Sequence, residues 1–494
     1  MRVFFAISAL LALGLTALAA AGPVTTGPAL GLHLRRCTQG RNKTPAMCGT
    51  FGVYENRAAG TGRIIQLGVV VLKAPHPTAD PIAFIEGGPG VAAVPDAPYI
   101  ADGDDPVLAA VKANRDIFFV DARGMGTSNP TKCNISPYGN MPAYFLQIWP
   151  DAILSACYLR YSAHSDPSAY NTDNAVDDLD DVRAALGYQK IVLYGGSYGS
   201  FFSFVYIRRH QAHVRSAALE GIIAPHYESL PGAPDGAQTA FDDLAAKCGR
   251  DATCRSTFPQ FVPHFYAVLR RFANGPVAIT VRNPKTKRWV EVRLSKEVLV
   301  DRIRENLYAP QTAAYLPYIV ERAYRGDYAP LGRLVDLWSQ FLAQGQDAGT
   351  NLGYRCADLD PFISDAELEE QAAHSFTGDL RVVAERHACE IWKVAPMPPS
   401  FNDPVRSTVP ILMVNGSDDP VTPPKYATAA LANLPNGRLV LVRGAGHGVD
   451  TPCTDRAMIR FLRNASVEGI DSDACVASFK PPPFATSMAK WQDY

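Results

Sequence analysis

One stretch decides the fold of this chain: Val192-Leu193-Tyr194-Gly195-Gly196-Ser197-Tyr198-Gly199-Ser200. The apolar run from Ile191 to Tyr194 predicts a buried strand, and the apolar residues after Ser200 predict a helix that packs back on a sheet. Between them lies the pattern G-x-S-x-G, in which only small residues fit two positions before and after the serine. A strand, a sharp turn and a helix in this order present the Ser197 hydroxyl to a base. Taken alone, the pentapeptide also fits a plain glycine-rich turn.

The composition allows a large folded core. The chain has 494 residues, of which 47% are hydrophobic and 19% charged, and its formal net charge is -1. This length fits two or three average domains, or one large domain with an insertion. No basic patch stands out, so the sequence indicates neither a nucleic acid nor an anionic membrane surface as a partner.

The N-terminus has the pattern of an export signal. Arg2 supplies a positive charge, an apolar stretch follows from Val3 to Leu18, and Ala17, Ala19 and Ala21 offer cleavage sites. We predict a signal peptide over residues 1–21 and a secreted or periplasmic protein that leaves the membrane after cleavage. An uncleaved anchor is the alternative, although the apolar stretch is short for a span of about 20 residues.

The ten cysteines agree with export, because an even number permits complete pairing outside the cytoplasm. They fall in successive near neighbours along the chain. We therefore expect the pairs Cys37–Cys48, Cys133–Cys157, Cys248–Cys254, Cys356–Cys389 and Cys453–Cys475. Free buried thiols are the alternative, and sequence alone does not fix connectivity. Zinc is disfavoured, since no C-x-x-C pair and no histidine cluster accompanies the cysteines.

Strands and helices alternate through residues 22–224, which we take as the first part of an α/β core. Predicted strands cover Ile64–Leu72, Pro81–Ile85, Ile117–Val120, Ile191–Tyr194 and Ser216–Leu219. A helix is expected over residues 173–187, with its aspartates on a solvated face, and residues 22–60 are expected to form a loop-rich arm. The alternation predicts a mostly parallel sheet with helices on both faces.

The hydrophobic pattern changes over residues 225–404. Helical patterns dominate there, with one β-like piece from Val277 to Val292, so we predict an inserted helical lid. The core resumes over residues 405–494 with strands at Val409–Val414 and Arg438–Val442 and ends in a proline-rich tail.

Three residues at predicted strand ends have the types and the chain order of a catalytic triad: Ser197, Asp419 and His447. Serine is a weak nucleophile and needs an adjacent base. Imidazole titrates near neutrality, and a carboxylate fixes its tautomer. Asp418 competes for the acid position, but Asp419 is preferred because the turn Asp419-Pro-Val-Thr-Pro423 leaves the strand.

Two backbone N–H groups are candidates for an oxyanion hole. The strand at Pro81–Ile85 runs into Glu86-Gly87-Gly88-Pro89-Gly90, whose glycines leave backbone N–H groups approachable. The N–H groups of Gly88 and Tyr198 are the predicted donors, with Gly87 as the near alternative to Gly88. A tight turn without this role is the structural alternative.

These motifs together resemble the α/β-hydrolase aminopeptidases related to proline iminopeptidase, above all the secreted tripeptidyl aminopeptidase branch of bacteria. The matching segments are Gly87-Gly-Pro-Gly90, Asp121-x-Arg-Gly-x-Gly-x-Ser128, Gly195-Gly-Ser-Tyr-Gly199, Asp419-Pro-Val-Thr-Pro423 and Gly446-His447-Gly448. The resemblance implies the α/β-hydrolase fold. It also implies that Ser197 is the nucleophile, Asp419 the orienting acid and His447 the base. The implied reaction releases short peptides from a free N-terminus through an acyl-enzyme, with no metal and no organic cofactor.

The chain departs from that branch in places that bear on the substrate. Glu220-Gly221 stands where the branch often has Asp-Gly, and the lid around Tyr354–Asp358 is only partly similar. An aminopeptidase must bind an ammonium group, for which Glu220 and Asp358 are candidates beside ordinary packing roles. An esterase acting on small esters or peptide-like natural products is the alternative function. A non-catalytic binding protein on the same fold is the remote one.

Overall fold

The computed structural model describes residues 30–491, apart from residues 79, 134, 136–142, 227–233 and 284–285. The predicted signal peptide, residues 1–21, lies outside the described residues. Among the described residues, nine strands form one sheet in the order β1-β2-β3-β5-β4-β6-β7-β10-β11. These strands are β1 (Gly31–Gln39), β2 (Thr44–Tyr54), β3 (Ile64–Leu72), β4 (Ile82–Ile85), β5 (Ile117–Val120), β6 (Ile191–Gly196), β7 (Val214–Glu220), β10 (Ile411–Gly416) and β11 (Gly437–Val442).

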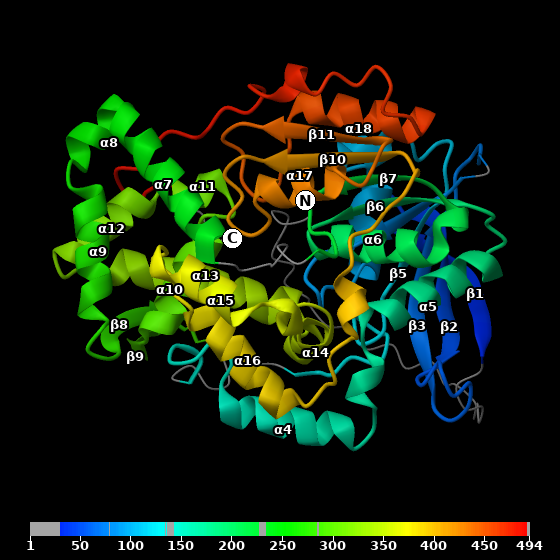
Figure 1. Cartoon of the computed structure of the whole chain (residues 1–494), viewed down its shortest axis with the longest axis horizontal. Helices are drawn as coiled ribbons and strands as arrows, with labels where there is room; N and C mark the ends of the chain where they lie inside the picture. The colour runs from blue at the N-terminus through cyan, green and yellow to red at the C-terminus, as the bar shows by residue number, and fades with distance from the viewer. Residues whose placement is uncertain are drawn as a thin grey trace.

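The sheet is mostly parallel. Strands β5, β4, β6, β7, β10 and β11 run in one direction, while β1, β2 and β3 pair antiparallel at one edge (Figure 1). The loop-rich arm expected over residues 22–60 is therefore wrong in its described part, because β1 and β2 form a hairpin there. Many of the hairpin's side chains are only half-buried, so its sequence lacks the continuous apolar run of the central strands.

Successive side chains of each central strand enter two different cores. In β6, Ile191 and Leu193 belong to the larger core and Val192 to the smaller one. This alternation follows from the two-residue repeat of a strand and requires apolar cover on both faces. The larger core is covered by α5 (Thr172–Ala185), α6 (Tyr198–His210) and α17 (Pro424–Leu431). The smaller core is covered by α1 (Ala97–Asp102), α2 (Pro106–Ala109) and α18 (Pro452–Asn464).

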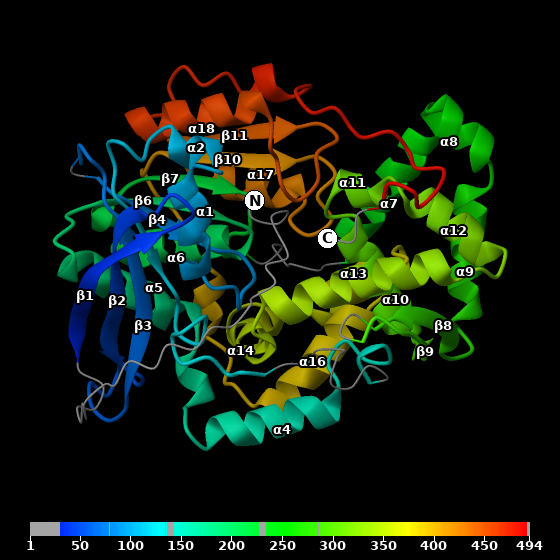
Figure 2. The same ribbon diagram turned by 180° about the vertical axis from the view of Figure 1, so that it is seen from behind.

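The chain between β7 and β10 forms a helical region that we call the lid (Figures 1 and 2). Its helices are α7 (Pro234–Arg250), α8 (Ala252–Thr257), α9 (Phe261–Arg271), α10 (Lys296–Asn306), α11 (Pro310–Ala313), α12 (Leu316–Tyr324), α13 (Ala329–Gly345), α14 (Ala348–Asp358), α15 (Asp365–Ala373) and α16 (Leu380–Trp392). Strands β8 (Val277–Arg282) and β9 (Trp289–Leu294) form a separate antiparallel pair, in the region of the predicted β-like piece.

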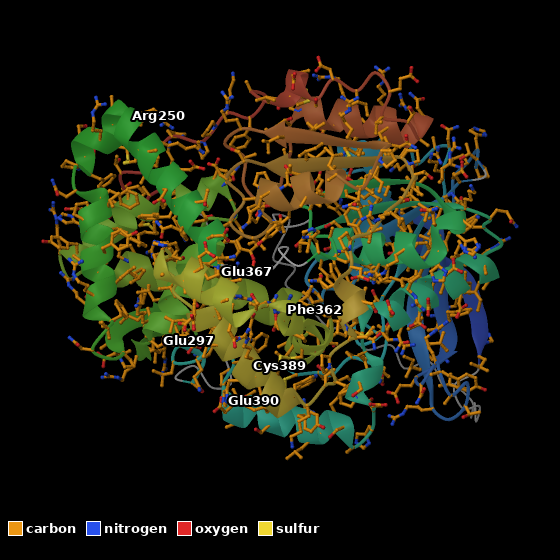
Figure 3. The ribbon with its side chains drawn as sticks, viewed as in Figure 1. Arg250, Glu297, Phe362, Glu367, Cys389 and Glu390 are labelled. Carbon is orange, nitrogen blue, oxygen red and sulfur yellow. A yellow bond between two sulfur atoms is a disulfide. The ribbon has the colours of Figure 1, made fainter. Side chains whose placement is uncertain are left out.

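One helix from the first part of the chain packs on the lid rather than on the sheet. Helix α4 (Asp151–Ser162) lies below α16, on which Cys389 and Glu390 are labelled in Figure 3. The rings of Tyr158 and Trp392 are 5.9 Å apart across this contact. The lid is therefore held by the earlier segment as well as by its own ends.

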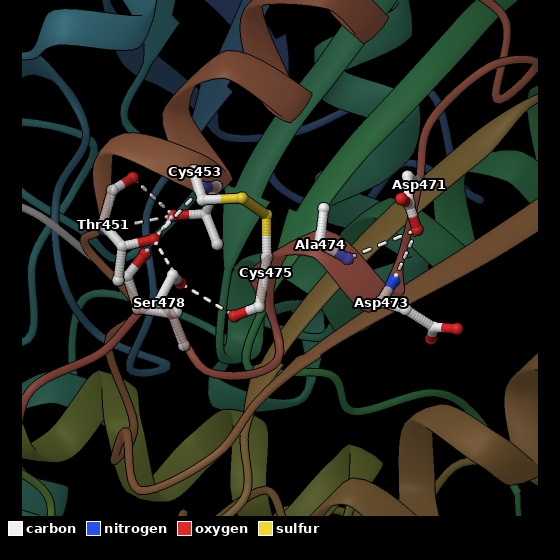
Figure 4. The surroundings of a disulfide bond; sticks show 9 residues. Thr451, Cys453, Asp471, Asp473, Ala474, Cys475 and Ser478 are labelled. Carbon is white, nitrogen blue, oxygen red and sulfur yellow. Dashed lines mark hydrogen bonds between the residues drawn. A yellow bond between two sulfur atoms is a disulfide. The ribbon is translucent and has the colours of Figure 1, made fainter.

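All ten cysteines are paired, in the five pairs expected from the sequence. The last pair, Cys453–Cys475, joins the start of α18 to the tail (Figure 4). Beside it, the hydroxyl groups of Thr451 and Ser478 are 2.9 Å apart. Farther on, the tail reaches the lid, where the Ala485 N–H donates to the Ala314 carbonyl. None of the helices in residues 30–491 that the structure describes is both long and apolar enough to cross a bilayer.

The aspartates of α5 form the expected solvated face only in part, because Asp181 is exposed but the others are buried or half-buried. Asp178 is buried, and its carboxylate accepts two hydrogen bonds from Arg123, at 2.8 and 2.9 Å. Asp180 accepts hydrogen bonds from Arg183 and Tyr206. The prediction failed for these two because helical spacing shows which residues share a face but not whether buried arginines lie opposite. Asp121 accepts from the Val94 and Thr127 N–H groups, which fixes its loop.

Candidate active site

Ser197 sits in a strained turn between β6 and α6. Its φ is 55° and its ψ is -126°, a conformation that residues with a side chain rarely adopt. The flanking glycines explain the pattern G-x-S-x-G. A Cβ on Gly199 would lie 2.6 Å from the Ile85 carbonyl oxygen, and one on Gly195 would lie 3.0 Å from the Gly199 carbonyl oxygen. The turn therefore requires glycine on both sides of the serine.

The structure brings Asp419 to His447. The Oδ2 atom of Asp419 lies 2.8 Å from the Nδ1 atom of His447, and both side chains are buried. The Asp419 carboxylate also accepts hydrogen bonds from the Val421 N–H and from the N–H and hydroxyl of Thr422. Burial alone would raise the pKa of Asp419, but the charge and hydrogen bond of His447 and the Thr422 hydrogen bonds lower it instead. Asp419 is therefore held as a carboxylate.

Asp418, the competing acid, points elsewhere. Its Oδ1 accepts a hydrogen bond from the Ser417 hydroxyl at 2.6 Å, and its other oxygen pairs with Lys247 on the lid helix α7. The two neighbouring aspartates thus have separate tasks. One contacts the imidazole and the other ties the strand-end loop to the lid.

Ser197 and His447 line the same cavity, which has a volume of about 590 Å³. This size lies within the range of small-ligand sites. Its walls come from the loop after β4, from the turn at Ser197 and from lid helices α10, α14 and α16. The Ser197 hydroxyl and an imidazole that is bound to a carboxylate thus line one cavity.

The lid contacts the loops on both sides of this cavity. The carbonyl of Tyr308 accepts a hydrogen bond from the His447 N–H at 2.8 Å, and the two rings are 5.0 Å apart. On the other side, the side-chain amides of Gln346 and Asn351 donate to the Pro89 carbonyl, at 2.6 and 2.8 Å. The lid therefore positions both the histidine loop and the glycine-rich loop.

Of the two predicted oxyanion donors, Gly88 lines this cavity and Tyr198 directly follows Ser197. Gly88 lines the cavity with a φ of 111°, and Tyr198 is the first residue of α6. The first N–H groups of a helix have no intrahelical acceptor, which leaves that of Tyr198 available. The Gly87 N–H donates to the Glu86 carboxylate at 2.6 Å, which favours Gly88 over Gly87 as the loop donor.

Glu86 and Asp96 form a buried acid pair in the cavity wall. Burial and the neighbouring Glu86 carboxyl raise the pKa of Asp96 to about 9, and burial also raises the pKa of Glu86. Two close carboxyls in a buried site share a proton because both cannot be charged there at low cost. No sequence pattern predicts this pair, since the two acids come from separate turns.

The two candidates for the ammonium site, Glu220 and Asp358, are not among the described residues that line the cavity. Asp358 accepts hydrogen bonds from the N–H and hydroxyl of Thr172, and burial raises its pKa to about 8. Glu220 lies at the end of β7. The lid acids that do line the cavity are Asp301, Glu305 and Asp347.

One group in the described part of the chain combines metal-ligand types: Asp180, His210 and His213. The Asp180 carboxylate is occupied by Arg183, which donates to both of its oxygens at 2.6 and 3.0 Å. A guanidinium in that position repels a cation, so we assign no metal to this group.

The chain is similar to known hydrolases. A family model described as alpha/beta hydrolase fold matches residues 80–449. The serine protease Hip1 of Mycobacterium tuberculosis (strain ATCC 25618 / H37Rv) is 26% identical over 314 residues, which are 59% of each chain. The match therefore spans less than two thirds of that relative. Carboxylesterase B of the same strain is 24% identical over 460 residues, 85% of each chain. A crystal structure of proline iminopeptidase from Mycobacterium smegmatis is 15% identical, with a TM-score of 0.36, covering 84% of this chain and 98% of that one.

Proposed function

Because the chain belongs to the α/β-hydrolase family, we propose that it is an exported serine hydrolase that releases short peptides or single residues from the free N-terminus of peptides. One observation carries the proposal: the Asp419–His447 pair and Ser197, held in a strained turn, open onto a single cavity. The acid, base and nucleophile have the chemistry that acyl transfer needs.

In the proposed reaction, the Ser197 hydroxyl attacks the scissile carbonyl while His447 accepts its proton. Asp419 keeps the proton of the imidazole on Nδ1 and stabilises the imidazolium that forms. The N–H groups of Gly88 and Tyr198 donate to the oxygen that becomes negative. The leaving amine takes the proton from His447, and water then hydrolyses the acyl-enzyme by the same steps.

Two features support a peptide substrate. Hip1 is named a serine protease, and the cavity wall carries the Glu86–Asp96 pair, whose carboxyl oxygens suit an ammonium group. An esterase is the second candidate, because the carboxylesterase relative matches over 85% of this chain. The acyl chemistry is the same in both, so the lid cavity decides between them.

Export is part of the proposal. The five disulfides are typical of proteins that mature outside the reducing cytoplasm, and the sequence of residues 1–21 has the pattern of a signal peptide. N-terminal sequencing of the protein recovered from the periplasm or the medium tests this directly, with the mature chain expected to begin after Ala19 or Ala21.

The substrate class is tested with matched chromogenic substrates. We expect cleavage of Pro and Ala-Ala-Pro p-nitroanilides with a free amine and much slower cleavage of their acetylated twins, because acetylation removes the ammonium charge. Simple aryl esters serve as the esterase arm. Cleavage of blocked peptides and esters without cleavage of free-amine peptides would overturn the aminopeptidase proposal.

A further inference from the structure

The lid wall of the cavity is lined by arginines. Arg302 and Arg304 come from α10, Arg355 from α14 and Arg381 from α16, and all four line the cavity. Arg302 and Arg304 are almost fully buried, with exposed fractions of 1% and 3%. A buried guanidinium group requires hydrogen-bond acceptors for its N–H groups, so the partners of these arginines show which N–H groups still lack an acceptor.

The acids of this wall are engaged mainly by two of the arginines. Arg302 donates to Asp301 at 2.6 Å and to Glu305 at 2.8 Å, and Arg381 donates to the other oxygen of Asp301 at 2.5 Å. Arg355 pairs with Asp360 and Glu385, which lie behind the cavity wall. Both carboxylate oxygens of Asp301 therefore already accept a hydrogen bond from an arginine other than Arg304.

Arg304 has no close carboxylate partner among the described residues. Its nitrogens lie 3.4 Å from Asp301 and 3.8 Å from Glu305, longer than a good charged hydrogen bond, and its one shorter bond, at 3.2 Å, goes to the neutral hydroxyl of Tyr308. The Nε atom of Arg302 is buried and has no acceptor among the described residues. Burial also raises the pKa of Glu305 to about 7, so near neutral pH this acid offsets the arginines only in part.

Arg304 also lies close to the chemistry. Its guanidinium stacks over the ring of Tyr308 at 5.5 Å, and that ring contacts the imidazole of His447. One aromatic side chain therefore separates the guanidinium from the histidine. A ligand group that reaches Arg304 can belong to a molecule whose carbonyl lies at Ser197.

We propose that Arg304, with Arg302, binds a carboxylate carried by the acyl part of the substrate. The planar fork of a guanidinium matches a carboxylate. A ligand carboxylate would supply an acceptor for the Nε atom of Arg302 and a closer charged partner for Arg304. This inference rests on the hydrolase proposed above but does not require a peptide. The carboxylate can be the side chain of Glu or Asp in a peptide, or the free end of a dicarboxylate half-ester.

The test uses substrate pairs that differ only in charge. 4-Nitrophenyl hydrogen glutarate is compared with 4-nitrophenyl methyl glutarate, and tripeptide p-nitroanilides with Glu at each position in turn are compared with their Gln twins. We expect kcat/KM to favour the charged member by about tenfold or more, as for a hydrogen bond to a charged group. A preference in the peptide pairs alone assigns an acidic side chain, and one in the ester pair alone assigns a half-ester. No preference in either pair overturns the proposal.

The variants locate the effect. Arg304→Met should bring the charged-to-neutral ratio close to one, whereas Arg304→Lys, which keeps the charge, should retain part of the preference. Arg322→Met is the matched control, since Arg322 is an exposed lid arginine paired with Asp327, and should leave the ratio unchanged. A ratio that is unchanged in Arg304→Met contradicts the proposal.

Inhibition of the wild-type enzyme tests the carboxylate site without requiring that any variant fold. Glutarate should inhibit hydrolysis of 4-nitrophenyl acetate more strongly than its monoamide does, and equal inhibition would count against the site. If the glutarate ester is preferred but no free-amine peptide is cut, the carboxylate site stands and the aminopeptidase proposal fails.

Discussion

The Oδ2 atom of Asp419 lies 2.8 Å from the Nδ1 atom of His447, while the adjacent Asp418 is bound to Lys247 of the lid. Two neighbouring carboxylates at the end of β10 therefore differ in function because of what faces them. The first contacts the imidazole that we propose as the base, and the second ties the strand-end loop to the lid.

This difference predicts the outcome of two matched substitutions. Asp419→Asn should lower kcat by about 10⁴-fold, because an amide cannot hold the imidazole in the same tautomer. Asp418→Asn should change kcat by less than about threefold, since it removes only a partly exposed ion pair. Both variants are compared at saturating substrate, with circular dichroism to show that they fold. Equal losses in the two variants would contradict the assignment.

Thr422 supports the same carboxylate. Its hydroxyl donates to the Asp419 Oδ2 at 2.5 Å and lies 3.2 Å from the His447 Nδ1. Thr422→Val keeps the shape but removes a hydrogen bond to a charged group, so kcat should fall by about 10- to 100-fold. Thr428→Val is the control, because Thr428 is exposed on α17 and bonds only a local carbonyl. Activity equal to that of the control would show that Thr422 is only a packing residue.

The requirement for glycine at position 199 can be tested by measuring stability, without an activity assay. A Cβ at this position meets the backbone oxygen of Ile85 at 2.6 Å, whereas a Cβ at Gly249 on α7 meets nothing within 4 Å. Gly199→Ala should therefore lower the free energy of unfolding by about 1–3 kcal/mol. Gly249→Ala should leave it unchanged or raise it by up to about 1 kcal/mol, because alanine is the better helix former. Chemical denaturation of both variants measures the difference.

The acid pair predicts a pH dependence of stability. Asp96, which faces Glu86 and Asp121, has its pKa raised to about 9 by burial and by those charges, while an unfolded aspartate titrates at about 4. The folded state therefore holds a proton that the unfolded chain has lost, so this contribution to stability falls as pH rises through that window.

Asp96→Asn removes this proton and keeps a hydrogen-bonding side chain. The melting temperature of the variant should rise relative to wild type between pH 5 and pH 9, with the largest difference at high pH. A difference that stays constant over that range would show that the proton on Asp96 is not linked to folding.

The features that could be predicted from the sequence are those with a strong local sequence pattern. The central strands are continuous apolar runs, and the turn at Ser197 is fixed by glycines whose missing side chains the structure explains. The β1–β2 hairpin was missed because most of its side chains are half-buried or exposed, so its sequence lacks a continuous apolar run. The ion pairs of the cavity wall could not be predicted from the sequence either, since Arg381 on α16 meets Asp301 on α10, a helix far away in the chain. Contacts of that kind depend on tertiary packing, which no local spacing encodes.

The central claim is that Ser197 is a nucleophile activated by His447. Intact-mass analysis after treatment with a fluorophosphonate measures this most directly. The account predicts a single adduct on the wild-type protein, mapped to Ser197, none on Ser197→Ala, and labelling slowed by orders of magnitude in His447→Gln. An unlabelled wild-type protein, or a Ser197→Ala variant that is labelled as fast as wild type, would contradict it.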